Sequence, residues 1–100
     1  ETAQALARRI VKDGGDTTAS RVTFGFRLCL TRPPSERELA RLIQLFEAAQ
    51  SDYADQPEEA KLLATDPLGP LPEGADPVDL AAWTLVGNVL LNLDETLARR

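Results

Sequence analysis

The sequence predicts an all-α fold, a compact bundle of about five helices in one domain spanning residues 1–100. Three observations predict it. Apolar residues recur at three- and four-residue intervals through most of the chain. Two segments begin with strong helix-start signals, at Ser35 and at Asp76. Only one segment alternates as a strand would, and a lone strand has nothing to pair with.

The first two helices are expected at 2–13 and 18–31. The first places Leu6 and Ile10 on one side and ends at the paired glycines Gly14 and Gly15. The second is ambiguous. Strand-like alternation is seen at Val22, Phe24, Phe26, Leu28 and Leu30, and helical spacing at Val22, Phe26, Cys29 and Leu30. Helix is preferred because no other segment could pair with a strand.

A third helix of about 18 residues is expected to begin after the break at Pro33 and Pro34. Ser35 and Glu38 have the spacing of a capping box, in which each side chain bonds the backbone N–H of the other residue. An apolar face follows at Leu39, Leu42, Ile43, Phe46, Ala49 and Tyr53. A short helix over 57–64 comes next, and 65–75 is an irregular connector rich in proline and glycine.

The last helix has the clearest start: Asp76 as the cap, Pro77 at the first position and Asp79 at the third. Helical steps of 100° give a wide apolar arc, made of Val78, Ala82, Leu85, Val86, Val89, Leu90, Leu93 and Leu97. Trp83 and Gly87 fall at its edge. Because a glycine in a helix costs about 1 kcal/mol relative to alanine, Gly87 suggests that another helix approaches closely there.

One polar stripe faces away from this arc, and it is the candidate contact surface of the chain. It consists of Thr84, Asn88, Asn92, Glu95 and Arg99. Two plainer interpretations stay open. The stripe can be a solvated seam with a Glu95–Arg99 pair, or Asn88 and Asn92 can bond the backbone of the connector.

The net charge of −5 is unevenly distributed. Residues 1–50 hold eight Lys or Arg against six Asp or Glu, whereas residues 51–100 hold three against ten. The acidic half disfavours nucleic acid as a partner. The basic residues of the first half are candidates to meet an acidic partner or simply form a solvated face: Arg21, Arg27, Arg32, Arg37 and Arg41. No segment approaches the ~20 apolar residues of a membrane span.

The residue inventory argues against common catalytic and metal sites. There is no histidine and one cysteine, so usual zinc, copper and haem sites and Ser–His or Cys–His pairs are not expected within this chain. Neighbouring carboxylates such as Asp94 and Glu95 point about 100° apart on a helix. We therefore expect no catalytic residue and no cofactor here. The absence of methionine suggests a fragment excised from a longer protein.

Two phrases, residues 26–39 (FRLCLTRPPSEREL) and 82–95 (AWTLVGNVLLNLDE), carry a family resemblance. Together they resemble the C-terminal region of a domain-of-unknown-function family expanded in planctomycetes and verrucomicrobia. Gly87 departs from the alanine common in that pattern. The resemblance implies helices at 21–31 and a large exported or periplasmic bacterial parent that often carries a planctomycete-type cytochrome c module. Haem would then belong elsewhere in the parent, and no catalytic residue carries over.

Three functional hypotheses follow. The leading one is a helical accessory module that contacts other domains of the parent protein. The alternative is the C-terminal part of an enzyme whose catalytic residues lie upstream. The third is self-association of the chain through its helical faces.

Overall fold

The computed structural model describes residues 2–98, with side chains described to residue 94. Within that range the chain forms five α-helices and no strand, which confirms the predicted all-α bundle. The helices are α1 (Ala3–Asp13), α2 (Thr18–Leu30), α3 (Glu36–Ala54), α4 (Pro57–Thr65) and α5 (Pro77–Ala98). The ambiguous second segment is therefore a helix.

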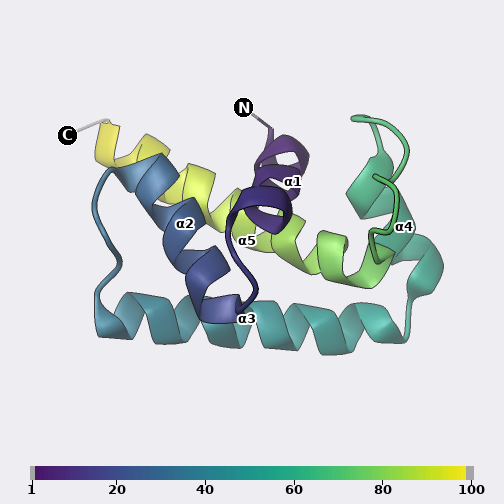
Figure 1. The fold of residues 1–100 in the computed structure, drawn as a ribbon, viewed down its shortest axis with the longest axis horizontal. Coiled ribbons are helices and arrows are strands. Elements are labelled where there is room, and N and C mark those ends of the chain that lie inside the picture. The colour runs from purple at the N-terminus through teal and green to yellow at the C-terminus, as the bar shows by residue number, and fades with distance from the viewer. Residues whose placement is uncertain (1, 99–100) are drawn as a thin grey trace.

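The longest helices, α3 and α5, run in opposite directions along the long axis of the molecule (Figure 1). The principal extents are 37 × 24 × 21 Å. Helix α1 packs against the middle of α5, and α2 lies near the C-terminal end of α5 (Figure 1). Helix α4 and the connector lie at the other end of the long axis (Figure 1). Besides α3 and α5, which span the molecule, one end of the bundle therefore contains α2 and the other contains α4.

Local signals start most of these helices. The Glu38 N–H donates to Ser35 Oγ at 3.1 Å and the Ser35 N–H to Glu38 Oε1 at 2.8 Å, which confirms the predicted capping box. Asp76 caps α5 by accepting from the Val78 N–H at 3.1 Å. A second capping box, which was not predicted, joins Thr17 and Ser20 at the start of α2. Serine takes the place of the usual Glu or Gln in that motif.

Helix α5 is the centre of the core, and five consecutive residues of its N-terminal half are buried. At most 2% of the surface is exposed for Leu80, Ala81, Ala82, Trp83 and Thr84. Trp83, which the helical pattern placed at the edge of the apolar arc, is fully buried. The Trp83 ring lies 4.2 Å from that of Phe46, centroid to centroid.

Gly87 marks the closest approach of α1 to α5. A Cβ atom at Gly87 would lie 3.0 Å from the carbonyl oxygen of Ala3 and 3.6 Å from Leu6 Cδ2. This confirms the expected helix contact at Gly87. The helix propensity lost at this glycine is offset by the packing that it permits.

Polar residues of α1 hold the end of α4 where a proline removes a backbone donor. The Leu63 carbonyl would accept from the residue four positions later if α4 continued, but this is Pro67, which has no N–H, and Asp66 follows the helix with an extended backbone. The buried Gln4 side chain supplies a donor instead: its Nε2 bonds the carbonyls of both Leu63 and Asp66, at 2.6 Å to Leu63. Gln4 therefore fixes the turn that follows α4.

Hydrogen bonds from Gln4 and Arg8 of α1 also hold the next residues of the connector. Gln4 Oε1 accepts from the Leu68 N–H at 3.1 Å, and Arg8 Nη2 donates to the carbonyls of Ala64 and Gly69 at 3.2 and 2.6 Å. Each of these groups lies outside regular helix bonding, and unpaired buried backbone groups are costly. Two side chains of α1 thus anchor both α4 and the connector.

Candidate functional site

A groove of about 300 Å³ opens between α2, the first half of α3 and the C-terminal half of α5. It is lined by Phe26, Glu38, Arg41, Leu42, Val89 and Leu93. Phe26 and Leu42 are buried and belong to the hydrophobic core. The volume lies at the lower limit of small-molecule pockets, so it suits one large side chain or a short segment.

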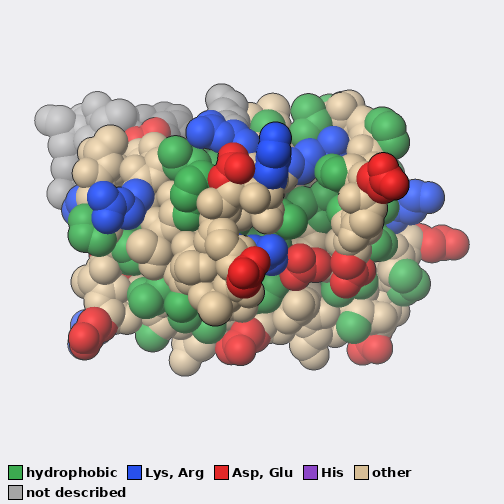
Figure 2. All heavy atoms as spheres, viewed as in Figure 1, with side chains coloured by type: hydrophobic (Ala, Val, Ile, Leu, Met, Phe, Trp, Pro, Cys, Tyr) green, Lys and Arg blue, Asp and Glu red, His purple; other side chains and the backbone are tan. Residues whose placement is uncertain are grey.

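Leu93 leaves apolar surface uncovered at this groove. Its side chain is 39% exposed, although it follows Val89 by one turn on the same side of α5. Leu28 in the last turns of α2 is exposed to the same degree. Figure 2 shows one face of the molecule, where hydrophobic side chains lie singly or in small groups among charges of both signs.

One side of the groove is fixed by Arg32 and Glu38. The Arg32 guanidinium bonds both Glu38 oxygens, at 2.9 and 3.0 Å, and lies 4.9 Å from the centroid of the Phe26 ring. Hydrogen bonding from Arg32, followed by that from the Ser35 backbone, lowers the pKa of Glu38 to about 2. The hydrogen bond with Glu38 in turn raises the pKa of Arg32. Glu38 is therefore a fixed anion and a poor general acid or base near neutral pH.

Three further arginines of α2 and α3 carry exposed positive charge, and one of them lines the groove. Arg27, Arg37 and Arg41 are exposed, and no carboxylate of residues 2–94 lies within ion-pair distance of them. Arg37 and Arg41 are one turn apart on α3, and Arg41 lines the groove itself. Because Glu38 is neutralised by Arg32, the groove combines apolar side chains with the unpaired positive charge of Arg41.

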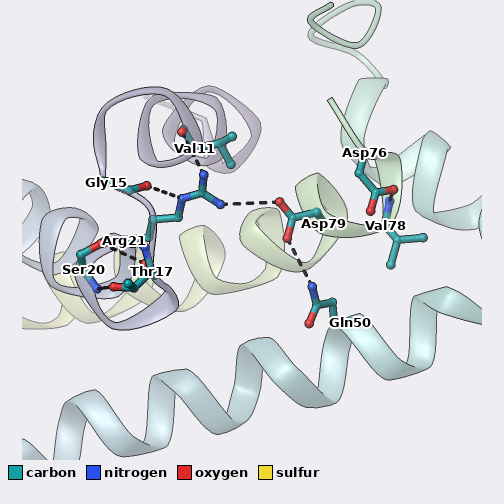
Figure 3. Close-up of polar contacts among 9 residues, drawn as sticks. All are labelled: Val11, Gly15, Thr17, Ser20, Arg21, Gln50, Asp76, Val78 and Asp79. Carbon is teal, nitrogen blue, oxygen red and sulfur yellow. Dashed lines mark hydrogen bonds and ion pairs between the residues drawn. The ribbon is translucent and has the colours of Figure 1, made fainter. Parts of the chain in front are cut away.

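Arg21, in contrast, forms an ion pair and hydrogen bonds within the bundle (Figure 3). Its guanidinium lies 3.8 Å from Asp79 Oδ2 and donates to the carbonyls of Gly15 and Val11 at 3.0 and 3.4 Å. Gln50 Nε2 donates to Asp79 Oδ1 at 3.4 Å, so α2, α3 and α5 meet at this carboxylate. Burial raises the pKa of Asp79, against the opposing effect of the Arg21 charge. Arg21 is therefore not available to an acidic partner.

The polar stripe predicted as the contact surface is divided by the structure. Thr84 is 2% exposed and donates to the Leu80 carbonyl at 2.8 Å, so it lies in the core rather than on a surface. Asn88 and Asn92 are exposed and lie one turn apart on α5. No hydrogen bond joins Asn88 to a described residue of the connector. The Glu95 side chain and Arg99 lie outside the described residues.

The apolar residues of the groove were predicted as core residues and not as site residues. Phe26, Leu42, Val89 and Leu93 come from three segments, and only the fold brings them to one opening. The available signal was the arginines that flank the apolar positions of α2 and α3. Those arginines were identified, but their relation to α5 was not.

Other classes of site find little support in the described part of the chain. Within it, no three His, Cys, Asp or Glu side chains gather as metal ligands would. No helix there is long and apolar enough to cross a membrane. No protein-family model, curated protein sequence or solved structure matches the chain significantly.

Proposed function

We propose that this chain is a helical accessory module that binds an acidic partner segment in the groove between α2, α3 and α5. The observation that supports the proposal is the pairing of an uncovered apolar hollow with exposed arginines that have no described carboxylate partner. A segment that presents one large apolar side chain with carboxylates one turn away on either side would match both features.

The two features contribute differently to binding. Fully burying a leucine-sized side chain stabilises a complex by about 1.5–3 kcal/mol, so the apolar anchor provides most of the affinity. Exposed ion pairs with Arg37 and Arg41 are worth about 0–1 kcal/mol each and are weakened by salt. They select an acidic partner over a basic one, because like charges at the rim would repel it.

The wider setting of the module rests on the family resemblance of residues 26–39 and 82–95. On that basis the partner belongs to another domain of a large exported bacterial protein. The complete reading frame tests this part of the proposal. A signal peptide and a C-x-x-C-H haem motif upstream would support it, whereas a frame that encodes only a short cytoplasmic protein would contradict it.

The groove itself can be tested with a synthetic helical peptide that carries one leucine flanked by glutamates one turn before and after it. Fluorescence anisotropy of the labelled peptide should show saturable binding to the wild-type chain. Replacing the peptide leucine by serine should weaken binding by about tenfold or more, since 1.4 kcal/mol is a factor of ten.

Two chain variants locate the binding. Arg41→Glu, in the groove, should weaken binding of the peptide. Raised salt should reduce the difference in peptide affinity between this variant and wild type. Lys61→Glu makes the same charge change on exposed α4 at the other end and should leave binding unchanged. Equal losses in both variants, or equal binding of the leucine and serine peptides, would contradict the proposal.

A further inference from the structure

Helix α4 presents the chemistry that the groove is proposed to bind. Leu62 is 61% exposed, the most exposed large hydrophobic side chain among those described. Glu58 and Glu59 lie one turn before Leu62 on the same side of the helix, and Asp66 follows the last residue of α4 as its C-cap. All three acidic residues are exposed. An exposed leucine with carboxylates near it complements an apolar hollow that is lined by Arg41, with the exposed Arg37 one turn away on α3.

The groove and Leu62 lie at opposite ends of the molecule. The groove is formed at the end of α2, whereas α4 lies at the far end of the 37 Å long axis (Figure 1). A chain therefore cannot place its own α4 in its own groove. The charges of the two ends are also complementary. Residues 27–41 carry four arginines against two glutamates, and residues 52–66 carry five carboxylates against one lysine.

We infer that the groove accepts α4 of a second copy of this chain, with Leu62 as the apolar anchor. The inference rests on the proposed function and names its occupant. Glu58, Glu59 or Asp66 of one copy would meet Arg37 and Arg41 of the next. Leu62 would cover the apolar surface that Leu93 leaves open.

Such an interface is heterologous, because the two copies use different surfaces. Each copy in a row keeps one free groove and one free α4, so association continues head to tail unless the rotation closes a ring. The contact is small, and we expect weak, concentration-dependent association that weakens further with salt.

The test uses two variants that each block one surface. Leu62→Glu removes the anchor and leaves the groove intact. Arg41→Glu combined with Leu93→Glu blocks the groove and leaves α4 intact. The three replaced side chains are exposed, and fluorescence of the buried Trp83 checks that each variant is folded. Leu68→Glu makes the same change as Leu62→Glu at an exposed leucine of the connector and serves as the matched control.

In sedimentation velocity over a concentration series, wild type and Leu68→Glu should associate progressively. Each blocked variant alone should associate at least about tenfold more weakly. An equimolar mixture of the two blocked variants should form a 1:1 dimer and stop there, because one intact groove then meets one intact α4. Only a head-to-tail contact between these two surfaces predicts that rescue.

Three results would overturn the inference. They are a wild-type chain that stays monomeric throughout, a Leu62→Glu variant that associates like wild type, and a mixture that forms no dimer. The acidic peptide assay separates these failures from failure of the proposed function. If the peptide binds while the wild-type chain stays monomeric, the groove has a different acidic occupant and the proposed function stands.

Discussion

Gln4→Leu tests the hydrogen bonds that join α1 to the end of α4. The substitution keeps roughly the volume of a 7% exposed side chain but removes three hydrogen bonds, two to carbonyls and one from the Leu68 N–H. A typical hydrogen bond contributes about 1 kcal/mol net, and a buried polar group left unpaired costs about 1–3 kcal/mol. Neither carbonyl has an alternative helical donor, because Pro67 lacks the N–H that would bond Leu63 and Asp66 lies beyond the helix with an extended backbone.

We therefore expect Gln4→Leu to lower the free energy of unfolding by about 3 kcal/mol, a large part of the 5–15 kcal/mol typical of a domain. The corresponding fall in Tm is about 12–24 °C. Urea unfolding followed by fluorescence reports this directly, because Trp83, the single tryptophan, is fully buried. The urea midpoint should fall while the m-value stays unchanged.

The matched control is Gln44→Leu, which makes the same substitution at an exposed position of α3. It should change stability by no more than about 0.5 kcal/mol. A loss below about 1 kcal/mol for Gln4→Leu would refute the reasoning, since water would then satisfy the carbonyls as well as the amide does.

Three further predictions concern packing and pH. Gly87→Leu should lower the free energy of unfolding by about 1–3 kcal/mol in urea titrations despite its better helix propensity, because its Cβ would lie 3.0 Å from the Ala3 carbonyl. The lowered pKa of Glu38 means that its ion pair with Arg32 stabilises the fold above the ordinary glutamate pKa. That contribution is lost as pH falls toward about 2. The urea midpoint of Glu38→Gln should therefore change less with pH than that of wild type across this range. The raised pKa of Asp79 has the opposite sign, so the stability of Asp79→Asn relative to wild type should increase as pH rises above the ordinary aspartate pKa.

Each of these predictions has a control and a contrary outcome. Asn88→Leu, at the exposed next position of α5, should change stability by no more than about 0.5 kcal/mol. An equal loss at Asn88 and Gly87 would contradict the helix-contact argument. The same acid dependence in Glu38→Gln and wild type would show that Arg32 does not hold this carboxylate in solution. A constant difference between Asp79→Asn and wild type across pH would contradict the raised pKa.

The helices could be predicted because their start signals are local. The Ser35–Glu38 capping box and the Asp76 cap need only residues within one turn, and both are confirmed. The Thr17–Ser20 box was missed because serine rarely serves at that position of the motif. The helix contact at Gly87 could be predicted because a glycine within a helix lowers helix propensity, and close packing must offset that loss.

The exposure of side chains on α5 was harder to predict, because it depends on which helices cover it. The helical pattern placed Thr84 and Asn88 on one polar stripe, one turn apart. Helix α4 packs against α5, and of these two residues Thr84 is buried while Asn88 is exposed. A pattern along one helix carries no information on where a separate helix ends.

The groove depends even more on tertiary structure. Its lining residues come from α2, α3 and α5, and each is an ordinary apolar or charged residue of an amphipathic helix. The sequence identified the arginines as candidates for an acidic partner but grouped Arg21 with them. The structure separates Arg21, which pairs with Asp79, from Arg37 and Arg41, which stay exposed.

The most direct test of the proposed binding groove is an NMR measurement of contacts between the acidic leucine peptide and the chain. If the groove binds the anchor, the methyl groups of the peptide leucine should show intermolecular NOEs to the Phe26 ring and to the methyl groups of Val89 and Leu93. NOEs confined to other faces of the bundle, or a bound peptide whose leucine stays in solvent, would contradict it.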